Sequence, residues 1–232
     1  MAKKKPNLPD GWDVESFVLA KLLSPETKVL FIYNEDYERL KNICTTLNLN
    51  ATILNDDLSQ LEKARNNFGF EVASGNVNAG ALDEYQDGEF DYVIAENVLP
   101  SARYPSDFLK QLTRIGKQVV LCNQNRAIFA ERLKFLMRGS FFVRNPYEIV
   151  PDDEYAWFNK YPWILTHKDI IHLCTCQDIT INSGIIIYKN GYIDNMYDIR
   201  SYPNLKAYKV YYLLSNDGTT NPSYKLGGAI FT

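Results

Sequence analysis

Short apolar runs alternate with amphipathic segments through the first 140 residues, and this alternation constrains the fold more than any other feature of the sequence. The runs predicted to be strands are 28–33, 51–55, 71–74, 90–97 and 117–123. Apolar residues at helical spacing lie between them. Because strands that alternate with helices pair in parallel through right-handed crossovers, we expect an α/β fold with helices on both faces of a sheet.

The C-terminal part of the chain has a different pattern. Two stretches enriched in tyrosine, isoleucine and valine, 184–195 and 206–216, are predicted to be strands joined by a short connection that contains Pro203. A connection of this kind is typical of antiparallel pairing. These strands should therefore extend the end of the parallel sheet. The 232 residues fit one domain, with residues 1–10 as a loose tail.

Charge and hydropathy exclude several classes of function. The net charge of −3 and the pI of about 5.5 argue against a nucleic-acid binder, which usually carries a basic face. No apolar run approaches the roughly 20 residues of a membrane span, so no membrane partner is expected. The N-terminus lacks the apolar region of a signal peptide, which makes the cytoplasm the expected compartment.

Cysteine and histidine are sparse, and they predict neither a metal site nor a catalytic residue. In a strand, Cys174 and Cys176 of the HLCTC segment would point to the same face, but no second cysteine or histidine pair with ligand spacing occurs elsewhere. Reduced structural cysteines are the better interpretation. The only histidines are His167 and His172, and neither has an acidic residue or nucleophile at readable spacing.

Three segments carry a family resemblance. The segment EFDYVIAENVL (89–99) resembles the fourth-strand motif of class I methyltransferases. The segments NRAIFAERLKFLMRGSFF (125–142) and IHLCTCQD (171–178) closely resemble the methionine biosynthesis protein MetW family, and the similarity covers roughly residues 28–214. The matching family-motif residues include Asn125, Phe129, Arg132 and His172.

The resemblance implies a Rossmann-like class I methyltransferase fold for the whole chain. Such a fold has a mostly parallel seven-stranded sheet, and its antiparallel C-terminal strand, here 206–216, is inserted beside strand 117–123. Proteins of this fold use S-adenosylmethionine (SAM). The positions that correspond to the SAM cleft are Tyr33, Glu35, Tyr37, Asp56, Asn76, Glu96 and Asn97.

The turn after the first strand departs from the family pattern. The family carries an acidic residue where Phe31 stands, and three glycines about where Tyr33, Glu35 and Tyr37 stand. Glycine is needed there because the cofactor lies against the backbone. The two tyrosines could be core or surface aromatics, with SAM held in a shifted pose. We interpret the turn instead as part of a degenerate or repurposed site.

Two further cofactor contacts are weakened. The acidic residue that closes the second strand in the family falls on Leu54, and Asp56 comes two residues late. The acidic residue after the third strand is replaced by Asn76, whose amide can still form hydrogen bonds. Because three departures affect one site, we infer that the fold was kept while its cofactor chemistry was not.

A segment dense in aromatic and acidic residues, 151–164, follows the motif after the fifth strand. It is either a loop that caps the core or a surface for a partner or methyl acceptor, because tyrosine and tryptophan are enriched at binding hot spots. The residues proposed for this surface are Tyr155, Trp157, Tyr161 and Trp163.

Three hypotheses follow from the sequence. The first is a non-catalytic methyltransferase-fold protein that needs no cofactor and acts through a partner, which the family resemblance implies is homoserine O-acyltransferase. The second is an active SAM-dependent methyltransferase with an atypical cofactor loop. The third is a pseudoenzyme that binds another small ligand in the old SAM cleft, with Tyr33 and Tyr37 lining it.

Overall fold

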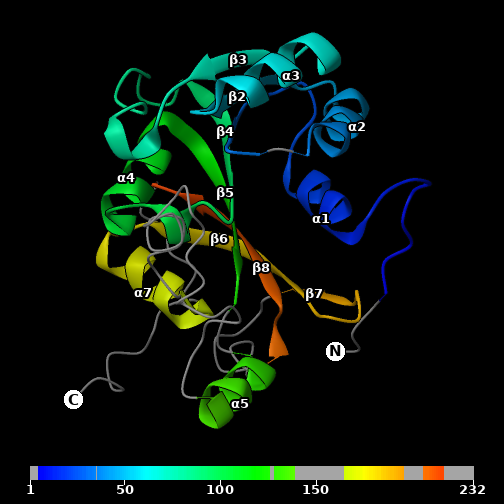
Figure 1. Ribbon diagram of the computed structural model, residues 1–232, viewed down its shortest axis with the longest axis vertical. Coiled ribbons are helices and arrows are strands. Elements are labelled where there is room, and N and C mark those ends of the chain that lie inside the picture. The colour runs from blue at the N-terminus through cyan, green and yellow to red at the C-terminus, as the bar shows by residue number, and fades with distance from the viewer. Residues whose placement is uncertain (1–4, 35, 126–127, 139–164, 196–205, 217–232) are drawn as a thin grey trace, which may run out of the picture.

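The computed structural model describes residues 5–34, 36–125, 128–138, 165–195 and 206–216. One sheet of eight strands runs through the molecule in the order β3-β2-β1-β4-β5-β8-β6-β7 (Figure 1). The strands are β1 (Lys28–Ile32), β2 (Asn50–Asn55), β3 (Glu71–Ser74), β4 (Phe90–Glu96), β5 (Gly116–Gln124), β6 (Thr180–Ile187), β7 (Ile193–Asn195) and β8 (Lys209–Ser215).

Helices cover both faces of this sheet, as the alternating pattern predicts. The helices are α1 (Val14–Leu22), α2 (Tyr37–Leu47), α3 (Leu58–Phe68), α4 (Pro105–Ile115), α5 (Phe129–Arg138) and α7 (His167–Cys176). Helices α1, α2 and α3 lie on one face, and α4 and α7 lie on the other (Figure 1). Among the described residues, no helix is both long enough and apolar enough to cross a membrane.

The first five strands pair in parallel, and the C-terminal strands add in antiparallel orientation. Strand β8 lies between β5 and β6, with Val120 opposite Leu213. The predicted placement of the last strand beside the fifth is therefore confirmed. The predicted count of seven strands is wrong by one. The stretch 184–195 divides into β6 and β7 because the chain turns at Gly191, which has a positive φ of 75°.

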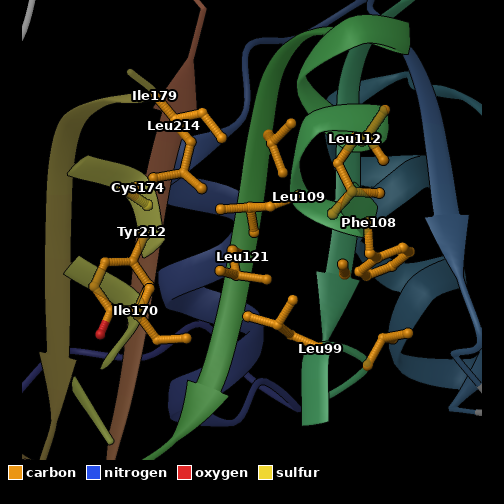
Figure 2. Packing of buried hydrophobic residues seen from close by; sticks show 14 of the residues in the cluster. Leu99, Phe108, Leu109, Leu112, Leu121, Ile170, Cys174, Ile179, Tyr212 and Leu214 are labelled. Atoms are coloured by element: carbon orange, nitrogen blue, oxygen red, sulfur yellow. The ribbon is translucent and has the colours of Figure 1, made fainter. Parts of the chain in front are cut away.

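The core has two apolar layers, one on each face of the sheet. Alternate residues of the buried parallel strands feed the two layers, which explains why those strands are apolar along their whole length. Leu109 of α4 and Ile170 of α7 are fully buried in one layer (Figure 2). Leu40 of α2 is fully buried in the other. The two layers fix the carboxyl ends of β1, β2 and β4, where the candidate site lies.

Candidate functional site

A cleft of about 750 Å³ opens at the carboxyl ends of β1, β2 and β4. From β1 the chain builds the sheet first outward through β2 and β3, and then in the other direction through β4 and β5. Ligands of open α/β sheets bind at such a reversal of strand order. The described lining residues are Glu15, Tyr33, Asn34, Asp36, Arg39, Asn55, Asp56, Asp57, Asn76, Asn78, Glu96, Asn97, Val98 and Ser101.

Tyr33 bridges the ends of three neighbouring strands. It follows β1, and its backbone N–H donates to the Leu54 carbonyl of β2 at 2.9 Å. Its hydroxyl donates to Asp56 Oδ2 at 3.2 Å and accepts the N–H of Val77, just beyond β3, at 3.0 Å. Asn76 Nδ2 donates to the same oxygen of Asp56 at 2.8 Å. Burial, and to a lesser extent the Asp56 charge, raises the pKa of Tyr33 to about 12, so it stays a hydroxyl donor.

The backbone of this turn keeps the conformation that favours glycine although no glycine is present. Tyr33 has a φ of 51°, in the left-handed region, which costs a residue with a Cβ about 1–2 kcal/mol. In most proteins that need such a turn, glycine supplies it and leaves room for a ligand against the backbone. Here a tyrosine adopts this conformation, and Tyr33 lines the cleft.

The second tyrosine of the turn does not line the cleft, so that prediction was wrong. Tyr37 is fully buried on the other side of α2, and its ring centroid lies 5.7 Å from that of Phe68 and 6.5 Å from that of Phe70. The reason is helical phase. The helix begins at Tyr37 with Asp36 as its N-cap, which places Tyr37 on the same inward face as Leu40. Glu35 lies outside the described residues.

Glu96, at the end of β4, is held by four hydrogen bonds. Arg39 of α2 donates to both carboxylate oxygens at 2.9 Å. Asn34 Nδ2 donates at 2.7 Å, and the Tyr211 hydroxyl donates at 2.6 Å. The side chains of Arg39 and Glu96 are only 12% and 8% exposed. Sequence reasoning placed Glu96 here but missed Arg39 and Tyr211, because nothing in a single sequence links residues 57 and 115 positions away from Glu96.

Several amides in the cleft wall are used by the chain itself. The side-chain oxygens of Asn34, Asn55 and Asn76 each accept the backbone N–H two residues further along, which is the usual role of asparagine in a turn. Asn97 has a positive φ of 57°, and its side-chain oxygen accepts the N–H of Gln124. These bonds stabilise the loops at the strand ends. They also reduce the number of polar groups left for a ligand.

The charge of the cleft is negative. Five carboxylates line it, of which Glu96 is paired with Arg39 and Glu15 with Lys209. The described lining residues include no histidine, cysteine or lysine. Proton transfer by this part of the wall would therefore depend on carboxylates or on the Tyr33 hydroxyl.

The family-motif residues lie away from this cleft wall and have different surroundings. Asn125 is buried, donates through Nδ2 to the Ala207 carbonyl at 3.1 Å, and accepts the N–H of His167 at 3.3 Å. It thereby ties β5 to the start of α7 and to the segment before β8. Arg132 is exposed on α5, and His172 is exposed on α7. The predicted partner surface, Tyr155, Trp157, Tyr161 and Trp163, lies outside the described residues.

The HLCTC segment forms part of helix α7 and not of a strand, so Cys174 and Cys176 do not share a face. Cys174 is buried, whereas Cys176 is exposed, with its Sγ 3.6 Å from Nε2 of His172. Within the described ranges, no group of three histidine, cysteine or acidic side chains is placed to hold a metal ion.

His167 is the buried histidine, and sequence reasoning gave it no role. It is the first residue of α7, its Nδ1 lies 2.6 Å from the Tyr212 hydroxyl, and the two rings stack. Burial lowers the pKa of His167 to about 4, so the imidazole is neutral in the folded protein. The histidine therefore serves as a structural hydrogen-bonding group between α7 and β8.

The order of the sheet and the position of the cleft match a known family. The family model for the methionine biosynthesis protein MetW matches residues 14–214. The chain belongs to the MetW family. No curated protein sequence matches it.

Solved structures show the same fold. A SAM-dependent methyltransferase from Thermotoga maritima, described as a possible histamine N-methyltransferase, superposes with a TM-score of 0.59 at 14% identity over 87% of each chain. A putative methyltransferase from Bacillus halodurans gives 0.57 at 10% identity over 88% of this chain and 98% of that one. A chain from the complex between the Haloferax volcanii Trm112 methyltransferase activator and a putative methyltransferase gives 0.60 at 11%, over 88% and 89%. The chain thus has the class I methyltransferase fold.

Proposed function

We propose that this MetW-family protein does not bind SAM and acts in the cytoplasm by binding a protein partner of methionine biosynthesis, homoserine O-acyltransferase. The observation that carries the first part is the state of the cleft. Tyr33, Asp56 and Asn76 are hydrogen-bonded to one another where the first glycine of a cofactor turn would leave space.

A ligand would have to compete with these contacts. A nucleoside cofactor needs a carboxylate after the second strand, and the Tyr33 hydroxyl already contacts Asp56 and the N–H of Val77. Further along the cleft, Arg39 and Glu96 form an ion pair that is almost completely buried. Breaking such a pair leaves an uncompensated charge, which costs about 3–5 kcal/mol. The intact family fold, combined with a cleft whose cofactor-turn position is taken by Tyr33, favours a role other than methyl transfer.

An exposed apolar face on α5 supports the second part of the proposal. Phe129, Leu133, Leu136 and Met137 are 65%, 43%, 80% and 78% exposed, and their spacing places them on one side of the helix. Contiguous exposed apolar residues mark interaction sites more often than chance. Because the family is named for methionine biosynthesis, we assign this face to the acyl-transfer enzyme of that route.

The α5 face can be tested with purified homoserine O-acyltransferase. We expect the double variant Leu136→Ser and Met137→Ser to bind the enzyme about 30-fold more weakly, which corresponds to about 2 kcal/mol at a hot spot. Leu58→Ser, which removes a similarly exposed leucine on α3, is the matched control and should leave binding unchanged. Surface plasmon resonance measures the dissociation constant of the enzyme for the wild type and for each variant. No measurable binding of the wild type would reject the partner, and equal binding by all three proteins would reject the face.

The aromatic-acidic segment 151–164 gives a separate prediction from sequence. Replacing Trp157 and Trp163 by alanine should each cost about 2 kcal/mol of binding free energy if they are hot spots. The acidic residues of the segment should make binding weaken with salt. A pull-down of wild type and double variant with the same enzyme measures the effect. If the wild type and the double variant retain the enzyme equally, the segment is a loop that caps the core and not a binding surface.

A further inference from the structure

The exposed cysteine and the exposed histidine of this protein lie together on helix α7. The sequence has four cysteines and two histidines, and all six lie within the described residues. Three of the cysteines and His167 are buried. The remaining two side chains, His172 and Cys176, are exposed, and their spacing places them on the same side of the helix. The protein therefore presents one thiol and one imidazole to solvent as a pair.

The distance between these two side chains matches the distance between two ligands of a tetrahedral zinc ion. Zinc binds a thiolate sulfur at about 2.3 Å and an imidazole nitrogen at about 2.0–2.1 Å. At the tetrahedral angle of about 109°, these bond lengths place the sulfur and the nitrogen about 3.6 Å apart. Sγ of Cys176 lies 3.6 Å from Nε2 of His172. The pair thus has the spacing of two ligands of one zinc ion.

One chain does not complete such a site from the part that the structure describes. A structural zinc ion takes four protein ligands, often two cysteines and two histidines. Among the described residues, no third histidine, cysteine or acidic side chain joins the pair to hold a metal ion. A second copy of the chain supplies the two missing ligands if a twofold axis passes through the metal. We propose that His172 and Cys176 form half of a zinc site that two copies of this protein share.

The charges at this surface are compatible with a contact between two copies. Zinc replaces the proton of each thiol, and both protons pass to solvent. One Zn²⁺ ion with two thiolates and two neutral imidazoles therefore carries no net charge. The exposed residues nearby on α7 and just after it have both signs, with Lys168, Asp169 and Asp178. A surface that meets its own copy across a twofold axis must be self-complementary, and mixed charges allow this.

Sedimentation velocity with zinc chloride tests the proposal, in a buffer with a phosphine reductant that prevents disulfides. We expect zinc to lower the dissociation constant of the wild-type dimer at least about tenfold relative to the same protein with a chelator, with one zinc ion per two chains. Cys176→Ala and His172→Ala should each abolish this effect. Lys168→Ala is the matched control, because it changes an exposed residue one turn before His172, and it should dimerise as the wild type does.

Cobalt(II) gives a second readout, because a tetrahedral cobalt–thiolate site absorbs visible light much more strongly than the hydrated ion. We expect this absorption to saturate at one cobalt ion per two wild-type chains and to be lost in Cys176→Ala. The proposal is overturned if zinc leaves the association of the wild type unchanged, or if zinc binds at one ion per chain without association. It is also overturned if both alanine variants, shown to be folded by circular dichroism, still dimerise with zinc.

Discussion

Replacing Glu96 by alanine is expected to destabilise the protein by about 3–5 kcal/mol, because it leaves the buried guanidinium of Arg39 without its counter-charge. Asn34 and Tyr211 lose their acceptor in the same variant. Urea unfolding followed by circular dichroism measures the change in the free energy of unfolding. A loss this large is a substantial part of the stability of a single domain.

Two further variants separate the ion pair from other effects. Glu89→Ala breaks the pair with Lys28, whose side chain is 41% exposed, and should cost at most about 1 kcal/mol. Changing Arg39 to Met and Glu96 to Leu together should recover most of the loss, because no buried charge is then left unpaired. A cost below about 1 kcal/mol for Glu96→Ala would show that the pair does not govern stability as described.

The second large effect is a loss of stability in mild acid that depends on His167. Its pKa is lowered to about 4 in the folded protein, from a usual value of 6.5. Below pH 6.5 the unfolded chain takes up a proton that the folded chain cannot bind until about pH 4. The contribution of His167 is therefore complete above pH 6.5 and is lost progressively as the pH falls toward 4. Between pH 7.5 and 5 this loss is about 2 kcal/mol.

Matched histidine variants isolate this contribution. His167→Asn keeps an acceptor near the Tyr212 hydroxyl and has no titratable group, so its stability should fall by about 2 kcal/mol less than that of the wild type between pH 7.5 and 5. His172→Asn, at an exposed position of the same helix, should retain the wild-type dependence. Identical curves for His167→Asn and the wild type would contradict the assignment.

The sequence predicts the parallel half of the fold well, because local patterns define it. The strands β1 to β5 lie within one or two residues of their predicted bounds. The antiparallel half depends on a turn that the pattern of 184–195 does not reveal. That stretch is rich in β-forming residues on both sides of Gly191, so one long strand and a hairpin have nearly the same composition. The structure forms the hairpin, in which β7 folds back and pairs with β6.

The candidate site could be predicted in position but not in contacts. The missing glycines drew attention to Tyr33, which lines the cleft. The same reasoning placed Tyr37 in the cleft, but its position in the first turn of α2 directs it into the core. Asp56 stands two residues after the family position, but the Tyr33 hydroxyl and the Asn76 amide both reach it. The side chains of Tyr33 and Asn76 are long enough to reach Asp56 at its shifted position. A motif comparison, by contrast, counts the two-residue shift of this acidic residue as its absence.

The central claim is that Tyr33 and its contact with Asp56 close the cofactor position of the cleft to SAM, and thermal unfolding of the wild type with and without SAM tests it most directly. A ligand present at 100 times its Kd would stabilise the fold by about 2.7 kcal/mol. For a domain of this size that raises Tm by roughly 5–10 °C. We expect a shift no larger than about 1 °C at millimolar SAM. A saturable increase of several degrees would contradict the account.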